Sequence, residues 1–267
     1  MEQRIGAIAR EAGQLVLQAK NIADSVAQKG SPRDLVTEYD TKVQELLRRR
    51  LAEEFPQYGF FGEEEKQHDI QGKEGFFIVD PIDGTTNFVR GLHHSCISVG
   101  LYVGGQMESA AVYNPYYDEL FTAGRGRGAY LNGKRLKMKP VSLQESLVLF
   151  GSAIYYRDTV PATVRMVQEL FPMTLDFRRG GSAALDLCYV AFGGGDVFFE
   201  TCLQPWDYAA GSLIVTEAGG IVTALDGNEL RLTSPCSVAA GNPLNHPQLI
   251  EIAQKILEEP DMKGRIK

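Results

Sequence analysis

The chain has 267 residues and a mass of 29.4 kDa, with 44% apolar and 23% charged side chains, which is typical of a globular protein. Its net charge of −7 argues against general affinity for the nucleic-acid backbone. The cysteines form no C-x-x-C pair, and no apolar run approaches the ~18 residues that a membrane span needs. Because the first residues also lack the pattern of a signal peptide, we expect a cytoplasmic protein with reduced thiols and no membrane partner.

Helical periodicity dominates the first part of the chain. Apolar residues recur at helical spacing over residues 3–28 and again from Val43 to Phe55, so the pattern predicts two amphipathic helices. Residues 30–32 (Gly-Ser-Pro) are expected to break the first helix and Pro56 to stop the second. Short β-type runs then follow, with tight turns between or after them, and they predict an antiparallel meander. The runs cover residues 58–61, 76–79, 95–102, 107–113, 119–123 and 129–131, and the turns cover residues 104–105 and 132–133.

The pattern changes after about residue 145, where expected strands alternate with expected helices. A helix-and-meander half followed by an alternating half predicts an α+β protein of layered sheets and helices. No linker separates the halves, so we expect one domain over residues 1–267, with subdomains at about 1–145 and 146–267 that share one site. The strands are expected at 147–150, 175–178, 197–200, 221–224 and 237–240, and the helices at 157–171, 182–192, 206–218 and 247–258.

The densest cluster of polar residues lies in segment 76–88, where an apolar strand ends in two carboxylates, Asp80 and Asp83. The proline between them fixes the backbone. Together with the Ile82 carbonyl they form an oxygen-only ligand set, which favours Mg²⁺ over zinc, and the backbone amides that follow suit a phosphate. An ordinary Asp-Gly turn after a strand is the alternative interpretation of this segment.

Other segments offer related chemistry. Asp40 lies near the start of the second expected helix, and residues 62–65 place three consecutive glutamates after a strand. Residues 180–184 are small and begin a helix, which lets a backbone approach an anion. Residues 205–207 open a later helix with the carboxylate of Asp207. Taken separately, each segment is also explained as a helix cap, a strand end or a solvated acidic run.

Together these motifs resemble the inositol monophosphatase family, within the Mg²⁺-dependent, lithium-sensitive phosphatase superfamily. The resemblance rests on two signatures, residues 77–90 around Asp-Pro-Ile-Asp-Gly-Thr and residues 206–211 (Trp-Asp-Tyr-Ala-Ala-Gly) continuing to residues 217–220. It extends from the first helix to residue 258. It implies a layered αβαβα sandwich of the inositol monophosphatase and fructose-1,6-bisphosphatase type, which is usually a homodimer.

The resemblance also implies a set of metal ligands. Asp80 would bridge two Mg²⁺ ions, with Glu63 and the Ile82 carbonyl holding the first ion. Asp83 and Asp207 would hold the second, and Glu63 would help to place a weaker third ion. The distances along the chain from Asp40 and to Asp80 favour Glu63 among the three consecutive glutamates.

Catalytic and substrate-binding roles follow from the same resemblance. Thr85, with Asp40 behind it, matches the pair that orients the attacking water, and Glu63 is a second acceptor for the proton. The amides of Gly84 and Thr85 match the backbone that binds the phosphate. The positions that match the rest of the substrate site are Gly181, Ser182, Ala183, Glu200 and Asp207.

The resemblance therefore implies a Mg²⁺-dependent phosphomonoesterase that hydrolyses inositol monophosphate to inositol and phosphate by direct attack of water. Glu200 is expected to accept hydrogen bonds from the hydroxyls of a small phosphorylated polyol and to repel a second phosphate. Residues 86–88 (Thr-Asn-Phe) match inositol monophosphatases, whereas nucleotide-type relatives more often have lysine there. Alternatives are activity on fructose 1,6-bisphosphate, 3′-phosphoadenosine 5′-phosphate or NADP.

Residues 124–129 satisfy the dinucleotide-binding pattern G-x-G-x-x-A, but a strand and a turn follow where that motif needs a helix, so a hairpin is predicted instead. Basic side chains are concentrated in residues 125–139, with no acid among residues 124–140. A solvated hairpin face is one interpretation of this segment. The other is a surface for an anionic partner. Some bacterial members of the family are thought to associate with the transcription machinery, which keeps a binding role beside catalysis open.

Overall fold

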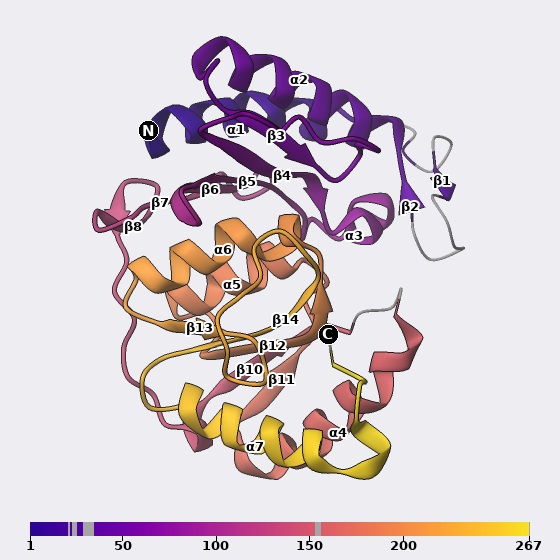
Figure 1. The fold of residues 1–267 in the computed structure, drawn as a ribbon, viewed down its shortest axis with the longest axis vertical. Helices are drawn as coiled ribbons and strands as arrows, with labels where there is room; N and C mark the ends of the chain where they lie inside the picture. The colour runs from indigo at the N-terminus through magenta and orange to yellow at the C-terminus, as the bar shows by residue number, and fades with distance from the viewer. Residues whose placement is uncertain (21, 23–25, 29–34, 153–155, 267) are drawn as a thin grey trace.

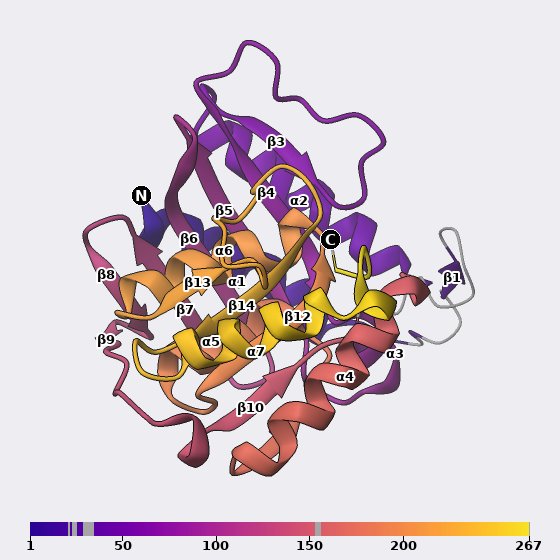
Figure 2. The ribbon, with the colours of Figure 1, turned by 60° about the horizontal axis from the view of Figure 1, so that its bottom comes forward.

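Helices and sheets stack in five layers in the computed structural model, which describes residues 1–20, 22, 26–28, 35–152 and 156–266 (Figure 1). Two N-terminal helices cover one face of a seven-stranded sheet, and two central helices separate that sheet from a five-stranded one. Two further helices cover the far face of the second sheet (Figure 2). The predicted α+β class and αβαβα sandwich are therefore confirmed. The organisation of residues 1–267 as a single domain stays a prediction.

The outer layer above the first sheet consists of α1 (Glu2–Leu17) and α2 (Glu38–Glu54). The prediction of a first helix to residue 28 was wrong, because the chain leaves the helix after Leu17. The N–H of Lys20 instead donates to the hydroxyl of Tyr39, which donates to the Lys20 carbonyl. Short strands β1 (Ala27–Gln28) and β2 (Leu35–Val36) then pair with each other. The expected break at residues 30–32 lies outside the described residues.

Strands β3 to β9 follow one another across the first sheet in chain order. Every neighbouring pair is antiparallel except β3 and β4, which are parallel. The expected antiparallel meander is therefore confirmed from β4 onward and was wrong for β3, because residues 63–74 carry the chain back before β4 begins. The strands are β3 (Gly59–Gly62), β4 (Gly75–Asp83), β5 (Cys96–Val103), β6 (Gln106–Asn114), β7 (Glu119–Gly124), β8 (Gly128–Leu131) and β9 (Lys134–Arg135).

The second sheet has the strand order β11-β10-β12-β14-β13, and its strands lie where the sequence predicts them. Strand β10 is parallel to β11 and β12, whereas β14 is antiparallel to β12 and β13. The strands are β10 (Leu147–Phe150), β11 (Asp176–Arg178), β12 (Val197–Leu203), β13 (Ile221–Thr223) and β14 (Cys236–Gly241). The helices are α3 (Thr85–Arg90), α4 (Val160–Leu170), α5 (Ala183–Phe192), α6 (Pro205–Glu217) and α7 (His246–Glu258).

Helices α5 and α6 form the central layer, and most of their residues are buried on all sides. That pattern is expected for a helix packed between two sheets. Both helices begin close to the end of β4, where the pairing with β5 shifts register between Asp80 and Asp83. The ends of β4 and β12 and the beginnings of α5 and α6 therefore meet in one place. No helix in the described ranges is long and apolar enough to cross a lipid bilayer.

Candidate metal and active site

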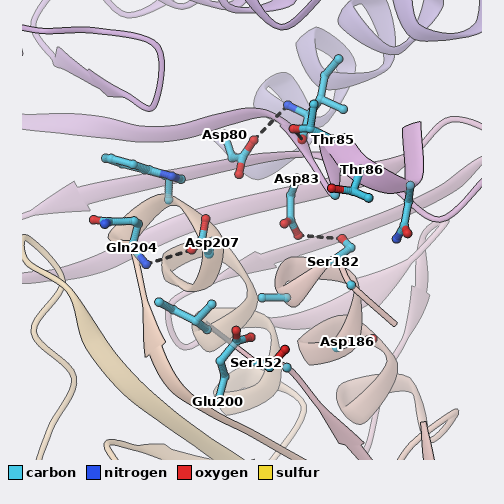
Figure 3. Close-up of a pocket in the computed structure, with 18 of the residues that line it drawn as sticks. Asp80, Asp83, Thr85, Thr86, Ser152, Ser182, Asp186, Glu200, Gln204 and Asp207 are labelled. Atoms are coloured by element: carbon cyan, nitrogen blue, oxygen red, sulfur yellow. Dashed lines mark hydrogen bonds between the residues drawn. The ribbon is translucent and has the colours of Figure 1, made fainter. Parts of the chain in front are cut away.

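A cavity of about 700 Å³ opens where the end of β4 meets the first turns of α5 and α6 (Figure 3). Asp40 lies behind Thr85 and is the one predicted site residue that does not line it. Residues that lie far apart in the sequence therefore share one concave surface. The predicted site residues that line the cavity are Glu63, Asp80, Ile82, Asp83, Gly84, Thr85, Gly181, Ser182, Ala183, Glu200 and Asp207.

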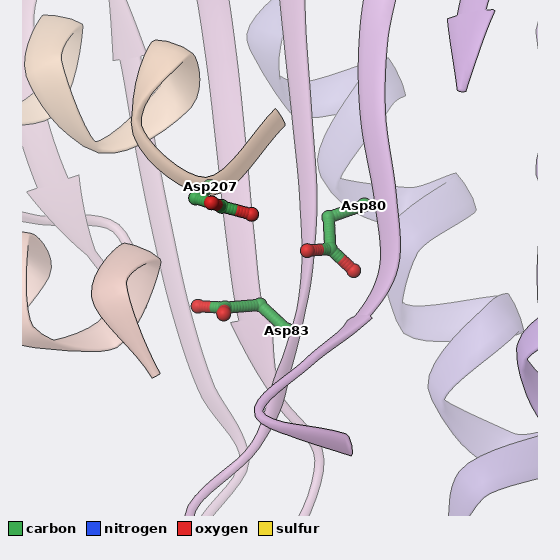
Figure 4. A group of neighbouring side chains, drawn as sticks. All are labelled: Asp80, Asp83 and Asp207. Atoms are coloured by element: carbon green, nitrogen blue, oxygen red, sulfur yellow. The ribbon is translucent and has the colours of Figure 1, made fainter. Parts of the chain in front are cut away.

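Three carboxylates converge on the floor of this cavity. Asp80 and Asp83 come from the end of β4 and Asp207 from the first turn of α6, and one oxygen of each lies within 4.8 Å of the others (Figure 4). Glu63, directly after β3, is the charged neighbour that most raises the pKa of Asp80. The four acidic groups predicted as metal ligands therefore form one cluster.

The electrostatics of the cluster fit a bound divalent cation. Burial, followed by repulsion from Glu63, raises the pKa of Asp80 well above its ordinary value. Burial and repulsion from Asp83 do the same for the pKa of Asp207. Buried carboxylates that repel one another are stable as anions only with a compensating positive charge. An all-oxygen donor set of this kind suits Mg²⁺.

Protein hydrogen bonds fix one oxygen of each aspartate (Figure 3). Oδ2 of Asp83 accepts from the Ser182 hydroxyl at 2.6 Å and the Ala184 N–H at 2.7 Å. Burial raises the pKa of Asp83 to about 6, and these two hydrogen bonds act in the opposite direction. Oδ2 of Asp207 accepts from the Gln204 N–H at 2.8 Å, and Oδ1 of Asp80 accepts from the Ile82 N–H at 2.9 Å.

Thr85 and Asp40, the pair that the family resemblance implies, lie beside each other. The hydroxyl of Thr85 lies 3.3 Å from Oδ1 of Asp40 and 3.2 Å from the Ile82 carbonyl, so its hydrogen has an acceptor on the protein. Asp40 is fully buried, and its Oδ2 accepts from the N–H and the hydroxyl of Thr37 at the start of α2. The lone pairs of the Thr85 oxygen are thereby directed to accept a hydrogen bond from the cavity.

Glu200 lies on the opposite wall, close to Ser152 (Figure 3), and its carboxyl group approaches Gly151. A side chain at Gly151 would place its Cβ 1.8 Å from Oε2 of Glu200, so only glycine permits this approach. Burial raises the pKa of Glu200 to about 8, with Asp186 adding to the shift and Arg179 opposing it. In the metal-free protein this favours the protonated carboxyl at neutral pH, which can donate a hydrogen bond to a ligand. The expectation that Glu200 repels a second phosphate as an anion stays a prediction.

Sequence reasoning missed several residues of the cavity wall. Gln204 and Trp206 shortly precede Asp207, and Arg179 directly precedes the small residues 180–184, so proximity in sequence could have suggested them. Ser152 carries no such signal, since only the parallel pairing of β10 with β12 brings it near Glu200. The lining residues not predicted are Thr86, Asn87, Gly151, Ser152, Tyr156, Arg179, Asp186, Cys202, Leu203, Gln204 and Trp206.

Known proteins resemble this chain over most of its length. The model of the inositol monophosphatase family matches residues 2–258. The chain is 40% identical over 238 residues to Nus factor SuhB of Escherichia coli K12, covering 88% of each chain. It is 41% identical over 256 residues to inositol monophosphatase 1 of Solanum lycopersicum, covering 92% of each.

Solved structures show the same fold. The extragenic suppressor protein SuhB of Bartonella henselae superposes with a TM-score of 0.87 at 33% identity, covering 95% of this chain and 98% of that one. The inositol monophosphatase of Anabaena superposes with a TM-score of 0.84 at 30% identity, covering 95% and 94%. The chain therefore belongs to the inositol monophosphatase family.

Proposed function

We propose that this protein is a Mg²⁺-dependent phosphomonoesterase that hydrolyses inositol monophosphate to inositol and phosphate. The observation that carries the proposal is the cluster of Asp80, Asp83 and Asp207 on the floor of a cavity of about 700 Å³, which can admit a ligand of this size. Two Mg²⁺ ions, with a weaker third beside Glu63, remain part of this proposal.

The contacts of the residues suggest a role for each of them in the reaction. When bound, Mg²⁺ supplies positive charge that offsets the phosphate dianion and helps to acidify water. Thr85 accepts a hydrogen bond from the attacking water and directs its own hydrogen toward Asp40 or the Ile82 carbonyl. Gly84 and Thr85 begin α3, so their N–H groups lack partners within the helix and can bind the phosphate. Glu200 donates to a hydroxyl of the alcohol.

Phosphate release from inositol 1-phosphate, measured against Mg²⁺ concentration, tests the proposal. We expect activity that requires Mg²⁺, is lost in excess chelator and is inhibited by Li⁺ at millimolar concentration. Asp83→Asn should abolish turnover, whereas Asp226→Asn, in an exposed turn remote from the cavity, should not. Full activity in chelator would overturn the metal assignment. The same phosphate-release assay, repeated with fructose 1,6-bisphosphate, 3′-phosphoadenosine 5′-phosphate and NADP, ranks these substrates by kcat/KM.

A second candidate function is association with the transcription machinery, favoured by the relatives named Nus factor SuhB. The predicted hairpin is present as β7 and β8, and its arginines are engaged within the protein. Arg125 donates to the Met107 carbonyl, and Arg127 lies 3.1 Å from Glu108. Four exposed cations have no ion-pair partner within the described part of the chain. They are Lys134, Arg135, Lys137 and Lys139.

A pull-down with the four exposed cations changed to glutamate tests this second function. We expect the variant to lose the transcription proteins that wild type retains while it keeps phosphate release. Equal retention by both proteins would exclude residues 134–139 as a docking surface. A homodimer in the cytoplasm is also proposed from the family resemblance, and light scattering after gel filtration measures the oligomeric state.

A further inference from the structure

Helix α2 carries three polar side chains at intervals of four residues, so they lie on one face of the helix. Asp40 is the carboxylate behind Thr85. Gln44, one turn later, is polar but buried, with 7% of the residue exposed. Arg48 follows after a further turn and is exposed. Gln44 is therefore a buried polar residue that the proposed mechanism does not use.

The side chain of Gln44 binds the backbone directly after Glu63. Its Oε1 accepts from the Glu64 N–H at 2.9 Å. A Cβ on Gly62 would lie 2.6 Å from that oxygen, so glycine at this position leaves room for the amide beside the end of β3. The N–H of Glu63 itself donates to the Val79 carbonyl at 3.1 Å. The peptide groups before and after the Cα of Glu63 are thus held by β4 and by α2, respectively.

A second contact ties the same segment to α2. Arg48 forms an ion pair with Glu65, whose side chain is 9% exposed. Burial raises the pKa of Glu65, and the positive charge of Arg48 acts in the opposite direction. Among the consecutive glutamates 63–65, Glu63 is the one that lines the cavity. Helix α2 therefore binds the two residues that follow Glu63, and the side chain of Glu63 is left to the cavity.

We propose that Gln44 is a positioning residue for Glu63, through which α2 sets how tightly the proposed metal site holds the ion beside Glu63. This inference rests on the proposed phosphatase function and refines its metal site. Loss of a group that orients a metal ligand typically lowers metal affinity about 10- to 100-fold. Because Asp40 and Gln44 share one face of α2, this helix orients both the proposed water-binding hydroxyl of Thr85 and a proposed metal ligand.

Metal binding to Gln44→Met, measured without substrate, tests the inference. The probe is Mn²⁺, a substitute for Mg²⁺ whose free concentration is measured by electron paramagnetic resonance. Methionine is as long as glutamine but offers the Glu64 N–H only a weak acceptor. We expect the Kd of the weakest bound ion to rise roughly tenfold, and that of the tighter ions to change less than about twofold. Gln44→Glu keeps an oxygen acceptor and should return the Kd to within about threefold of wild type.

Gln254→Met is the matched control. Gln254 also binds a backbone group through its side-chain amide, the Asp226 carbonyl, but it is exposed and does not line the cavity. Its Mn²⁺ titration should match that of wild type. Hydrogen exchange of the Glu64 N–H in chelator should accelerate in Gln44→Met and not in Gln254→Met, and this readout depends on neither metal nor turnover. Should methionine disturb folding, Gln44→Asn, whose amide is one methylene too short to reach Glu64, takes its place.

Binding and kinetics together separate failure of the inference from failure of the proposed function. Weaker binding of one ion in Gln44→Met, with recovery in Gln44→Glu, would support the inference even if no phosphate ester were hydrolysed. In an active enzyme, the Mg²⁺ concentration for half-maximal activity should rise by the same factor, and saturating Mg²⁺ should restore kcat. An unchanged titration of Gln44→Met, or equal weakening of every ion, would overturn the inference and leave the phosphatase function intact. A wild-type protein that binds no Mn²⁺ would overturn both.

Discussion

The hydroxyl of Ser182 donates to Oδ2 of Asp83 at 2.6 Å, and this contact ties the start of α5 directly to the end of β4. The Ala184 N–H donates to the same oxygen, so Oδ2 of Asp83 is held by two hydrogen bonds from the protein. The loop before α5, which the family resemblance implies contacts the substrate, thus also orients the proposed metal ligand Asp83. Ser182 is a positioning residue for the proposed metal site.

Removing this hydroxyl should weaken the metal site. We expect Ser182→Ala to raise the Mg²⁺ concentration for half-maximal activity roughly tenfold, the usual order for a group that orients a ligand. The hydrogen bond from Ser182 lowers the pKa of Asp83, so its loss raises that pKa above about 6 and lets protons compete better with Mg²⁺. The defect should therefore grow as the pH falls from 8 to 6. Ser212→Ala, which removes a buried hydroxyl within α6, is the control, and an unchanged Mg²⁺ dependence of Ser182→Ala would contradict the assignment.

The hydroxyl of Thr85 is expected to matter for the chemical step. Thr85→Ala should lower kcat roughly 10²- to 10⁴-fold, the usual contribution of a positioned proton-transfer group. The midpoint of thermal unfolding should change little, since Asp40 keeps its two hydrogen bonds from Thr37. Thr85→Ser restores the hydroxyl and should recover most of the rate. Loss of activity in both variants would point to a role of the threonine methyl group instead.

Asp83→Asn should stabilise the metal-free protein while abolishing turnover. Asparagine keeps an oxygen for Ser182 and Ala184 but removes one of the buried negative charges that raise the pKa of Asp207. We expect a higher midpoint of thermal unfolding for the variant in chelator, and a smaller increase on addition of Mg²⁺ than in wild type. A lower midpoint in chelator would mean that repulsion within the cluster does not limit stability.

Glu200 gives the stability of the metal-free protein a defined pH dependence. Its pKa is about 8 in the folded protein against an ordinary 4.5. The folded state therefore binds this proton more tightly than the unfolded chain does. The protonation of Glu200 makes its full contribution to the free energy of unfolding below about pH 4.5, and this contribution declines as the pH rises to about 8. Glu200→Gln removes the decline. Compared with wild type, it should be more stable to urea at pH 9, and the difference should shrink toward pH 5. A constant difference across this range would contradict the shifted pKa.

The raised pKa of Glu200 also leads to a kinetic prediction. Burial raises the pKa of Glu200 to about 8 and favours the protonated carboxyl, whose donor glutamine keeps, so we expect Glu200→Gln to lower kcat/KM for inositol 1-phosphate only a few-fold. Glu200→Ala removes the donor and should cost roughly tenfold. Neither variant should affect p-nitrophenyl phosphate, which has no polyol hydroxyl. Equal losses on both substrates would instead assign Glu200 to the support of the metal site.

That the carboxylates lie together could be predicted because they occur in short motifs, whereas their role as metal ligands stays a prediction. Asp80 and Asp83 share one strand end, and Asp207 follows the proline that starts α6. The wall of the cavity was harder to predict, because Ser152 and Arg179 reach it only through the parallel pairing of β10 with its two neighbours. The protonated state of Glu200 depends on burial by several elements, which no local pattern records.

Errors in the fold prediction have a similar origin. The apolar pattern after Leu17 continues at helical spacing, yet the backbone at Lys20 bonds to Tyr39 of the second helix. The parallel pairing of β3 with β4 depends on the path of residues 63–74, which have no regular pattern of apolar residues. In both cases a contact between distant residues overrides local propensity.

The position of α5 and α6 between the two sheets has a consequence for synthesis of the protein. The last strand of the first sheet ends at Arg135, but the helices that cover its inner face are completed only at Glu217. A nascent chain thus exposes an apolar sheet face while residues 136–217 are still being made, which is a condition that favours aggregation and chaperone binding. Asp207 is also translated after Asp80 and Asp83, so the full carboxylate cluster can assemble only once the central layer is in place.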